Sequence, residues 1–415
     1  MKRDKIGILS LGCPRNLVDS ESILGRLCKK GYQVTDMDKA DIGIINTCAF
    51  IEEAKKESID AILDLIDLKK EGRLKKVIVY GCLPQRYRQK LQEELPEIDA
   101  FAGKISLNHD SRNFSITPAH YAYLKICEGC INACSFCVIP KIKGKFTSLD
   151  MNSVVKRAKD LDSAGASEIN IIGQDISGYG RDLYGECKLT EVLGKITKTI
   201  KNTRWIRLLY LYPSRVNDEL LDFIKDEPRI CKYIDLPIQH INGRILKLMR
   251  RKTAKKDIVR LIDKIRKKIP QVAIRTSVIA GFPSETEAEF KELLDFIKEI
   301  KFERLGAFTY SREEDTAAYN FKQQVPERVK LQRLNAIMQE QQRVSEEVNR
   351  KFLGQEIDVL IDEEEKGTYL GRSQFDAPEV DGIVYVKSSR KLMPGDLLRV
   401  KITDTLEYDL TGEVC

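Results

Sequence analysis

The chain has 415 residues, of which 42% are hydrophobic and 32% charged, and its formal net charge is +7. This composition is typical of a soluble globular protein, and the length predicts two or three domains. No apolar run reaches the roughly 20 residues that span a bilayer, which excludes a membrane-spanning protein. We interpret the apolar run at residues 6–12 as a first strand and not as the core of a signal peptide. We therefore expect a cytoplasmic protein with no membrane partner.

The charge is divided unevenly along the chain. Residues 352–415 contain 7 basic and 14 acidic side chains, a net charge of −7, whereas residues 1–351 contain 63 basic and 49 acidic side chains, a net charge of +14. An acidic module repels a nucleic-acid backbone and attracts a basic protein. The C-terminal part of the chain therefore favours a protein partner.

Residues 1–118 alternate between strand and helix patterns, which predicts a parallel α/β domain with right-handed crossovers. Apolar runs rich in Ile and Val predict strands at 6–12, 41–47 and 76–81. Helical patterns follow at 16–30, 49–70 and 84–94.

Three cysteines, Cys13, Cys48 and Cys82, each directly follow one of these strands, and we call them the dispersed triplet. Parallel strands end at the same edge of a sheet, which is where open α/β sheets build their sites. A 4Fe–4S cluster normally takes four cysteines, so three thiolates leave one iron open. An open metal position is typical of a reacting site and not of a structural one.

Residues 119–325 repeat the strand–helix unit six times, too few for a closed eight-stranded barrel, which predicts a partial (β/α)6 barrel. We expect its site at the carboxyl ends of the strands. The strands are expected at 121–126, 168–173, 206–212, 233–237, 273–280 and 305–310.

The last part of the chain changes character. Residues 326–352 have the pattern of one long charged helix, and residues 353–415 contain short strand patterns with a turn at Pro394–Gly395. We expect these strands at 356–361, 382–386, 397–402 and 409–414. They predict a small antiparallel β-barrel.

A second group of cysteines, Cys130, Cys134 and Cys137, has the spacing CxxxCxxC, and we call it the compact triplet. It follows the first predicted barrel strand and would again hold three irons of a 4Fe–4S cluster. The alternative is a zinc knuckle, but the nearest histidine that could be a fourth ligand is His120, ten residues before the motif. Cys127 forms a further CxxC with Cys130, so the sequence alone also permits a ligand set that is shifted by one cysteine and includes Cys127.

The other four cysteines form no disulfide framework, because the total of 11 is odd and the spacing irregular. We interpret them as small buried residues or surface thiols: Cys28, Cys187, Cys231 and Cys415.

The open iron of the compact triplet suits a small chelator with an amine and a carboxylate. S-adenosylmethionine (SAM) carries this pair beside a sulfonium leaving group, and one electron from the cluster would release a 5′-deoxyadenosyl radical. Phe136 and Gln174 are candidate SAM contacts, although a core aromatic and a loop-stabilising amide are the alternative interpretations. We expect no catalytic residue beyond the cluster ligands.

The segment CINACSFC at 130–137 and the two triplets together give the chain a pattern that resembles the radical SAM methylthiotransferases. In that family an α/β domain with three cluster cysteines precedes a radical barrel and a TRAM domain. Three segments are most similar to the branch that modifies ribosomal protein S-twelve of the small subunit. They read SLGCPRNLVDSE (10–21), NTCAFIEEAKKESID (46–60) and KGKF (143–146).

The resemblance implies addition of a methylthio group to the β-carbon of an aspartate in ribosomal protein S-twelve. It also implies two 4Fe–4S clusters, SAM, an external electron donor and a protein substrate, which we expect to bind through the acidic C-terminal domain. Monomer is the expected oligomeric state.

Two alternatives remain at this point. A tRNA adenosine methylthiotransferase has a similar architecture, but a module that binds tRNA should be basic, not acidic. A non-catalytic iron–sulfur protein that binds RNA or carries electrons would gain nothing from two open iron positions.

Overall fold

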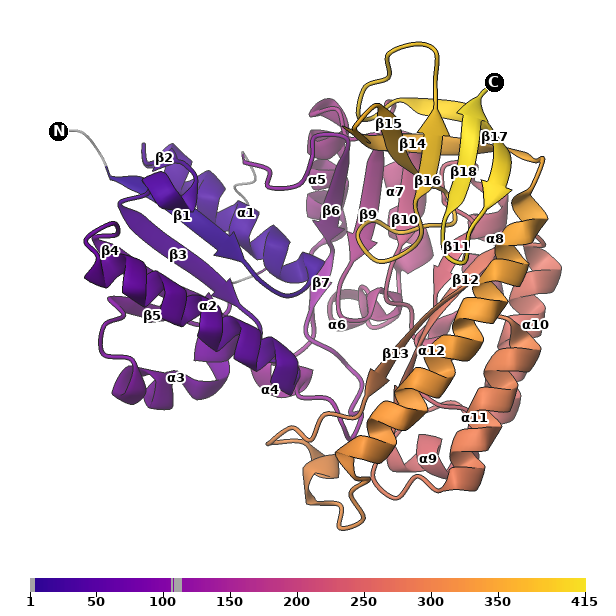
Figure 1. The fold of residues 1–415 in the computed structure, drawn as a ribbon, viewed down its shortest axis with the longest axis horizontal. Coiled ribbons are helices and arrows are strands. Elements are labelled where there is room, and N and C mark those ends of the chain that lie inside the picture. Colours follow the sequence, from indigo (N-terminus) through magenta and orange to yellow (C-terminus); the bar gives the residue numbers. More distant parts are fainter. Residues whose placement is uncertain (1–3, 106, 108–113) are drawn as a thin grey trace.

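The computed structural model describes residues 4–105, 107 and 114–415, which form three parts (Figure 1). These are a parallel α/β domain, a partial barrel and a small closed β-barrel, so the expected fold class is confirmed. The N-terminal domain, in indigo, lies beside the partial barrel, and the C-terminal domain, in yellow, covers one end of it. None of the described helices is long and apolar enough to cross a membrane.

The N-terminal domain is a five-stranded parallel sheet of order β2-β1-β3-β4-β5. The central strands have the predicted Ile- and Val-rich sequences; one face of the sheet packs against α2 and α3 and the other against α1. The strands are β1 (Lys5–Ser10), β2 (Gln33–Val34), β3 (Ile42–Thr47), β4 (Lys76–Gly81) and β5 (Ala100–Ala102). The helices are α1 (Pro14–Lys29), α2 (Glu52–Lys70) and α3 (Cys82–Glu94). Both edge strands were missed, because two or three residues carry no periodic pattern.

The partial barrel consists of two three-stranded parallel sheets, of order β10-β9-β6 and β11-β12-β13. A single parallel bridge between Ile206 and Ile230 links them. Among the described strands, β6 and β13 do not pair with each other, so the barrel stays open as expected. The strands are β6 (Tyr121–Lys125), β9 (Glu168–Ile172), β10 (Trp205–Leu208), β11 (Tyr233–Asp235), β12 (Ala273–Ala280) and β13 (Arg304–Thr309).

Amphipathic helices cover the outside of the partial barrel and bury their apolar faces against its strands. Local caps fix their starts: the Asp150 carboxylate accepts from the Ser153 amide at 3.0 Å at the start of α5. The covering helices are α5 (Met151–Ser163), α7 (Leu189–Thr199), α8 (Asp218–Asp226), α10 (Lys255–Lys268) and α11 (Glu287–Ile300). Short elements between them are β7 (Cys127–Glu128), α4 (Ile139–Lys143), β8 (Thr147–Ser148), α6 (Arg181–Tyr184) and α9 (Gly243–Leu248).

Helix α12 (Glu327–Asn349) runs along the partial barrel and leads into the C-terminal domain (Figure 1). This domain is a closed barrel of order β14-β15-β16-β18-β17. Its strands are β14 (Glu356–Glu365), β15 (Thr368–Ser373), β16 (Val384–Lys387), β17 (Leu397–Thr405) and β18 (Leu410–Val414).

Two details of the C-terminal domain differ from the sequence prediction. The pair β16–β18 is parallel, whereas every other pair is antiparallel as expected. Strand β15 was missed because Gly371 interrupts its apolar pattern; a Cβ there would lie 2.7 Å from the Leu360 carbonyl oxygen. The glycine lets β14 and β15 approach closely.

The C-terminal domain covers the amino ends of the partial-barrel strands. Its loop between β15 and β16 places Phe375 and Ala377 in one apolar cluster with Tyr121 and Tyr233, the first residues of β6 and β11. The opposite end of the barrel, where the strands finish, therefore faces the N-terminal domain.

Candidate active site between the N-terminal domain and the barrel

The dispersed triplet lies at the carboxyl edge of the N-terminal sheet. Cys13 caps the start of α1 after β1, Cys48 directly follows β3, and Cys82 is the first residue of α3 after β4. Because β1, β3 and β4 are neighbours in the sheet, the three thiols are brought together. Burial raises the pKa of Cys82 to about 12; Lys143 opposes this rise, and the Cys48 and Cys13 thiols add to it.

The loops after β1 and β3 approach each other closely at this edge because the first of them contains a glycine. Gly12 has a φ of +87°, and a Cβ there would lie 2.9 Å from Cys48 Cβ. Asn16 links the same loops: its Nδ2 donates to the Leu11 carbonyl at 3.0 Å and to the Thr47 carbonyl at 3.2 Å. Backbone geometry and one amide side chain therefore hold the dispersed triplet in place.

Arg15 connects the dispersed triplet to the barrel. Its Nε donates to Cys13 Sγ at 3.2 Å, and its Nη1 donates to the Gly173 carbonyl at 2.9 Å, just after β9. Burial alone raises the pKa of the Cys13 thiol, but Arg15 and the Asn16 amide outweigh it, so the pKa lies below its ordinary value. The surroundings of Cys13 therefore favour its thiolate form, which is the form that binds metal.

The compact triplet lies in the loop after β7. Cys130 Sγ accepts from the Asn132 amide and from Asn132 Nδ2, both at 3.4 Å, and the Cys137 amide donates to the Cys134 carbonyl at 3.2 Å. Burial raises the pKa of Cys137 to about 12, and Cys134 and Cys130 contribute to the rise. Arg251 Nη1 donates to Cys134 Sγ at 3.7 Å.

Cys127, the fourth cysteine of this region, lies in the apolar core of the barrel. Its Sγ donates to the Asp175 carbonyl at 3.7 Å, and a Cβ on Gly173 would lie 2.4 Å from that sulfur. Burial raises the pKa of its thiol well above the ordinary value. These contacts are those of a neutral core thiol.

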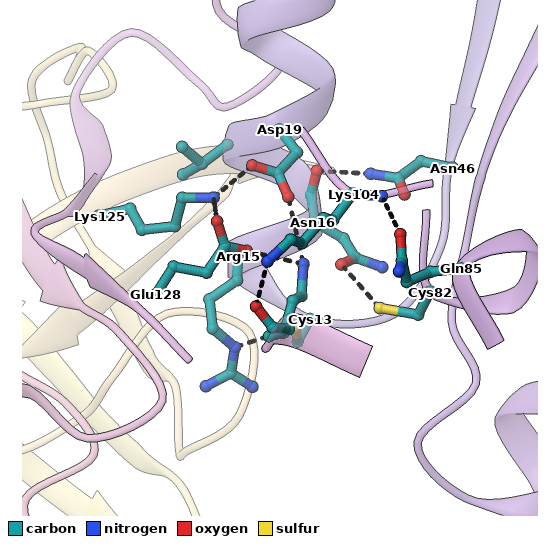
Figure 2. A network of polar contacts seen from close by, with 12 residues as sticks. Cys13, Arg15, Asn16, Asp19, Asn46, Cys82, Gln85, Lys104, Lys125 and Glu128 are labelled. Atoms are coloured by element: carbon teal, nitrogen blue, oxygen red, sulfur yellow. Dashed lines mark hydrogen bonds and ion pairs between the residues drawn. The ribbon is translucent and has the colours of Figure 1, made fainter. Parts of the chain in front are cut away.

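A buried network of four charges joins α1 of the N-terminal domain to β6, β7 and α4 of the partial barrel (Figure 2). Figure 2 shows Lys125 between Asp19 and Glu128, and Lys143 Nζ lies 2.9 Å from Glu128 and 3.5 Å from Asp19. All four side chains are at most 9% exposed. Asp19 belongs to α1, which begins after Cys13. Charges buried this deeply are tolerated only when paired, so the network fixes α1, which follows Cys13, against the elements that precede and follow the compact triplet.

The N-terminal domain also contacts the far edge of the barrel. Arg86 in α3 donates to Glu313, after β13, at 2.6 Å, and Lys55 in α2 lies 3.1 Å from the same carboxylate. Since α1 packs against β6, the domain closes the open side of the barrel at the carboxyl ends of its strands.

The other residues singled out from the sequence take different positions. Gln174 follows β9, and both polar atoms of its amide are buried without a hydrogen-bond partner among the described residues. Phe136 packs against the cluster that contains Met249 and Tyr310. His240, the histidine after β11, is fully buried, and its Nε2 lies 2.9 Å from Glu285 Oε1, which is a structural contact within the barrel.

The donor sets fit two iron–sulfur clusters and a polar cofactor. Among the described residues no three His, Cys, Asp or Glu side chains converge on a single metal ion. In a cluster each cysteine binds a different iron, so its ligands stand farther apart than those of one ion. The unpartnered amide of Gln174 supplies a donor and an acceptor for a bound polar molecule.

Sequence reasoning missed several residues of this site. Arg15, Arg251 and the four-charge network were not identified, because isolated basic and acidic residues usually lie on solvated helix faces. The position of Lys125 within the apolar run of β6 was the one available sign of a buried charge.

Three protein families match the chain in order: "Uncharacterized protein family UPF0004" over residues 5–103, "Radical SAM superfamily" over 124–297 and "TRAM domain" over 353–415. Among solved structures, the radical SAM methyltransferase TsrM from Kitasatospora setae, with cobalamin and a [4Fe-4S] cluster bound, has a TM-score of 0.54 at 12% identity. It covers 89% of this chain and 81% of that chain, and the likeness shows a shared fold.

Curated relatives match the chain over nearly its full length. The ribosomal protein uS12 methylthiotransferase RimO of Clostridioides difficile (strain 630) is 47% identical, over 99% of this chain and 98% of the relative. The protein of the same name from Caldanaerobacter subterraneus subsp. tengcongensis is 48% identical, over 98% and 99%. With its two cysteine triplets, its radical SAM barrel and its TRAM domain, the chain belongs to the RimO family of radical SAM methylthiotransferases.

Proposed function

We propose that this protein adds a methylthio group to the β-carbon of an aspartate in ribosomal protein uS12, the S-twelve protein of the small subunit. The observation that carries the proposal is the presence of two three-cysteine sets, one at the carboxyl edge of the N-terminal sheet and one at the same end of the barrel. A single cluster would suffice for an electron carrier, whereas methylthiolation needs two reacting sites.

Cys130, Cys134 and Cys137 would hold the 4Fe–4S cluster that binds SAM, and Cys13, Cys48 and Cys82 would hold the auxiliary 4Fe–4S cluster. When bound, these groups supply the carbon radical and the methylthio group. The core contacts of Cys127 support its exclusion from the ligand set.

The protein's own residues would bind SAM and hold the two cluster sites in position. The Gln174 amide would bind polar atoms of SAM, and Phe136 would pack on its adenine. Arg15 and the four-charge network would keep the dispersed triplet against the barrel mouth. The closure of the open barrel side by α1, α2 and α3 would exclude water from the reacting centre.

We further propose that the acidic C-terminal domain attracts the protein substrate. Glu363, Glu364 and Glu365 are exposed at the β14–β15 turn, and their charge favours a basic protein over tRNA. This domain lies at the opposite end of the barrel from the triplets. A substrate that contacts both must span the strands, roughly 17–20 Å for five to six residues.

Three further expectations belong to this proposal. The radical step needs an external electron donor. The protein acts in the cytoplasm, where ribosomes are assembled. It acts as a monomer, which sedimentation of the reconstituted protein measures directly.

The test offers two substrates to one preparation. The clusters are reconstituted without oxygen, reductant and SAM are added, and either ribosomal protein uS12 or unmodified tRNA is supplied. We expect one methylthio group on an aspartate of uS12, detected by mass spectrometry. Methylthiolation of tRNA alone would overturn the proposal.

A further inference from the structure

One short segment of the barrel contacts two arginines, and each of these arginines donates to a cysteine of a different triplet. The segment comprises residues 210–212, which begin two positions after the end of β10 (Trp205–Leu208), and it contains two tyrosines separated by one residue. Each tyrosine ring lies against the guanidinium of an arginine from another part of the chain. Each arginine in turn donates to a cysteine sulfur of a different triplet.

The first branch leads to the dispersed triplet. The Arg15 guanidinium lies 4.4 Å from the centroid of the Tyr210 ring, and its Nε donates to Cys13 Sγ at 3.2 Å. Its Nη1 is held by the Gly173 carbonyl at 2.9 Å. Three contacts in different directions leave this side chain little freedom to move.

The second branch leads to the compact triplet. The Arg251 guanidinium lies 4.2 Å from the centroid of the Tyr212 ring, and its Nη1 donates to Cys134 Sγ at 3.7 Å. Its Nη2 donates to the Pro237 carbonyl at 2.5 Å. The two branches therefore have the same construction: a ring, a guanidinium, a backbone carbonyl and a sulfur.

The segment itself is held in an unusual conformation. Tyr210 has a φ of +67°, in the left-handed region that a residue with a side chain rarely adopts. Its amide donates to Asp235 Oδ2 at 2.9 Å, and its carbonyl accepts from the Ile176 amide at 3.1 Å. Tyr212 is fixed as well, because its amide donates to Ser177 Oγ at 3.1 Å.

The support for Tyr210 continues to the far end of the barrel. Asp235 is 1% exposed, and its Oδ1 lies 3.3 Å from Arg275 Nη1. Arg275 Nε lies 3.3 Å from Asp381 Oδ1 in the C-terminal domain. The strained residue is thus anchored by a polar chain that runs through the barrel.

We propose that residues 210–212 form a shared positioning element that sets the reduction potentials of the two clusters separately, through Arg15 and Arg251. The inference rests on the ligand sets of the proposed function. A hydrogen bond from a permanent cation to a cluster sulfur stabilises the reduced, more negative cluster and raises its potential. The two tyrosines are positioning residues, since they act through the arginines.

The test measures each cluster alone. The triple variant Cys130→Ala, Cys134→Ala, Cys137→Ala keeps the dispersed triplet, and the triple variant Cys13→Ala, Cys48→Ala, Cys82→Ala keeps the compact one. Iron content and cluster absorbance are measured first, and the midpoint potential then follows from a redox titration monitored by electron paramagnetic resonance.

In the first background, we expect Arg15→Gln to lower the equilibrium constant for one-electron reduction about tenfold, a shift of about 59 mV to lower potential. Arg251→Gln is the matched control and should leave this potential unchanged. In the second background the two variants should exchange roles.

The tyrosines supply a second readout. In the background that keeps the dispersed triplet, Tyr210→Leu removes the ring face and should lower the potential in the same direction as Arg15→Gln, by less. Tyr210→Phe keeps the ring and should have no effect. Full cluster content with unmoved potentials, or an equal shift of both clusters by either arginine variant, would overturn the inference alone. Failure of either background to assemble a cluster would overturn the ligand assignment, and the inference with it.

Discussion

The two ends of the partial barrel differ in whether particular buried polar side chains find partners within the chain. At the amino ends of the strands, Glu168 is fully buried and lies 2.8 Å from Arg207 and 2.6 Å from Arg372, and Arg304 Nε donates to Asp376 at 2.8 Å. At the carboxyl ends, the described residues leave both polar atoms of Gln174 without a partner.

This contrast distinguishes buried polar groups that stabilise the fold from buried polar groups that are available to a ligand. Buried polar groups whose partners are all supplied by the chain hold the fold together. A buried amide without a partner costs stability and is retained where a ligand completes it. We therefore expect the amino end to be the structural end of the barrel and the carboxyl end to be the one that binds and reacts. The predictions below test this division.

The largest effect is expected from the carboxyl end. Replacing the compact triplet with alanine should abolish release of 5′-deoxyadenosine from SAM, because no thiolate then holds the reacting cluster. The unfolding midpoint of the metal-free protein should stay the same, since these cysteines lie in a loop. Chromatography of the reaction mixture and thermal unfolding measure the two quantities.

The matched control replaces the dispersed triplet instead. That variant should lose about half of its iron yet still release 5′-deoxyadenosine. Release that survives loss of the compact triplet would contradict the assignment of the radical site, and full iron retention without the dispersed triplet would contradict the second ligand set.

The next largest effect is expected from the amino end. Glu168→Gln leaves Arg207 and Arg372 buried with an incomplete partner and should lower the free energy of unfolding by about 3–5 kcal/mol. Glu186→Gln, which breaks a surface pair with Lys188, is the control and should have little effect. Urea unfolding provides the measurement. Similar losses in the two variants would show that burial does not decide the result.

Gln174→Ala should separate binding from stability. We expect SAM affinity to fall about tenfold, because one or two hydrogen bonds to the cofactor are lost. Stability without SAM should stay the same or rise, since a buried amide without a partner is removed. Calorimetric titration and urea unfolding measure these changes. A loss of stability at unchanged affinity would make Gln174 a structural residue.

The smallest effect concerns pH at the amino end. Burial works to raise the pKa of Asp362, but the hydrogen bond from His120 and the charge of Arg372 bring it below its ordinary value. A depressed carboxyl pKa stabilises the fold above the unfolded pKa of about 3.9, and this contribution is lost as the pH falls through the folded pKa. Asp362→Asn should therefore lose less stability than the wild type between about pH 5 and pH 3. Parallel urea midpoints for the two proteins across that range would contradict this.

The sequence predicted the parts of the site that depend on strand order. Cys13, Cys48 and Cys82 each follow an apolar run, and parallel strands deliver such residues to one edge, so the dispersed triplet was predictable before any contact was known. The compact triplet was predicted as a candidate ligand set from its CxxxCxxC spacing alone. The six barrel strands also followed from the alternation of patterns.

The remaining features depend on contacts that no local pattern records. Arg15 and Tyr210 are 195 positions apart, and their contact arises only when the N-terminal domain packs against the barrel. The positive φ of Tyr210 gave no sign in the sequence, because glycine or asparagine is the usual residue there. The parallel pair β16–β18 likewise depends on how the small barrel closes and not on the strands themselves.

The packing of the C-terminal domain on the barrel also limits which parts of this chain can be lost in evolution. Loss of residues 353–415 would remove the Gln374 carbonyl and the Asp376 carboxylate that now accept from Arg207 and Arg304. It would also expose to water the apolar cluster in which Phe375 and Ala377 cover Tyr121 and Tyr233. The C-terminal domain is therefore part of the packing of the barrel, and a chain without it would need a more polar surface at the amino ends of the strands.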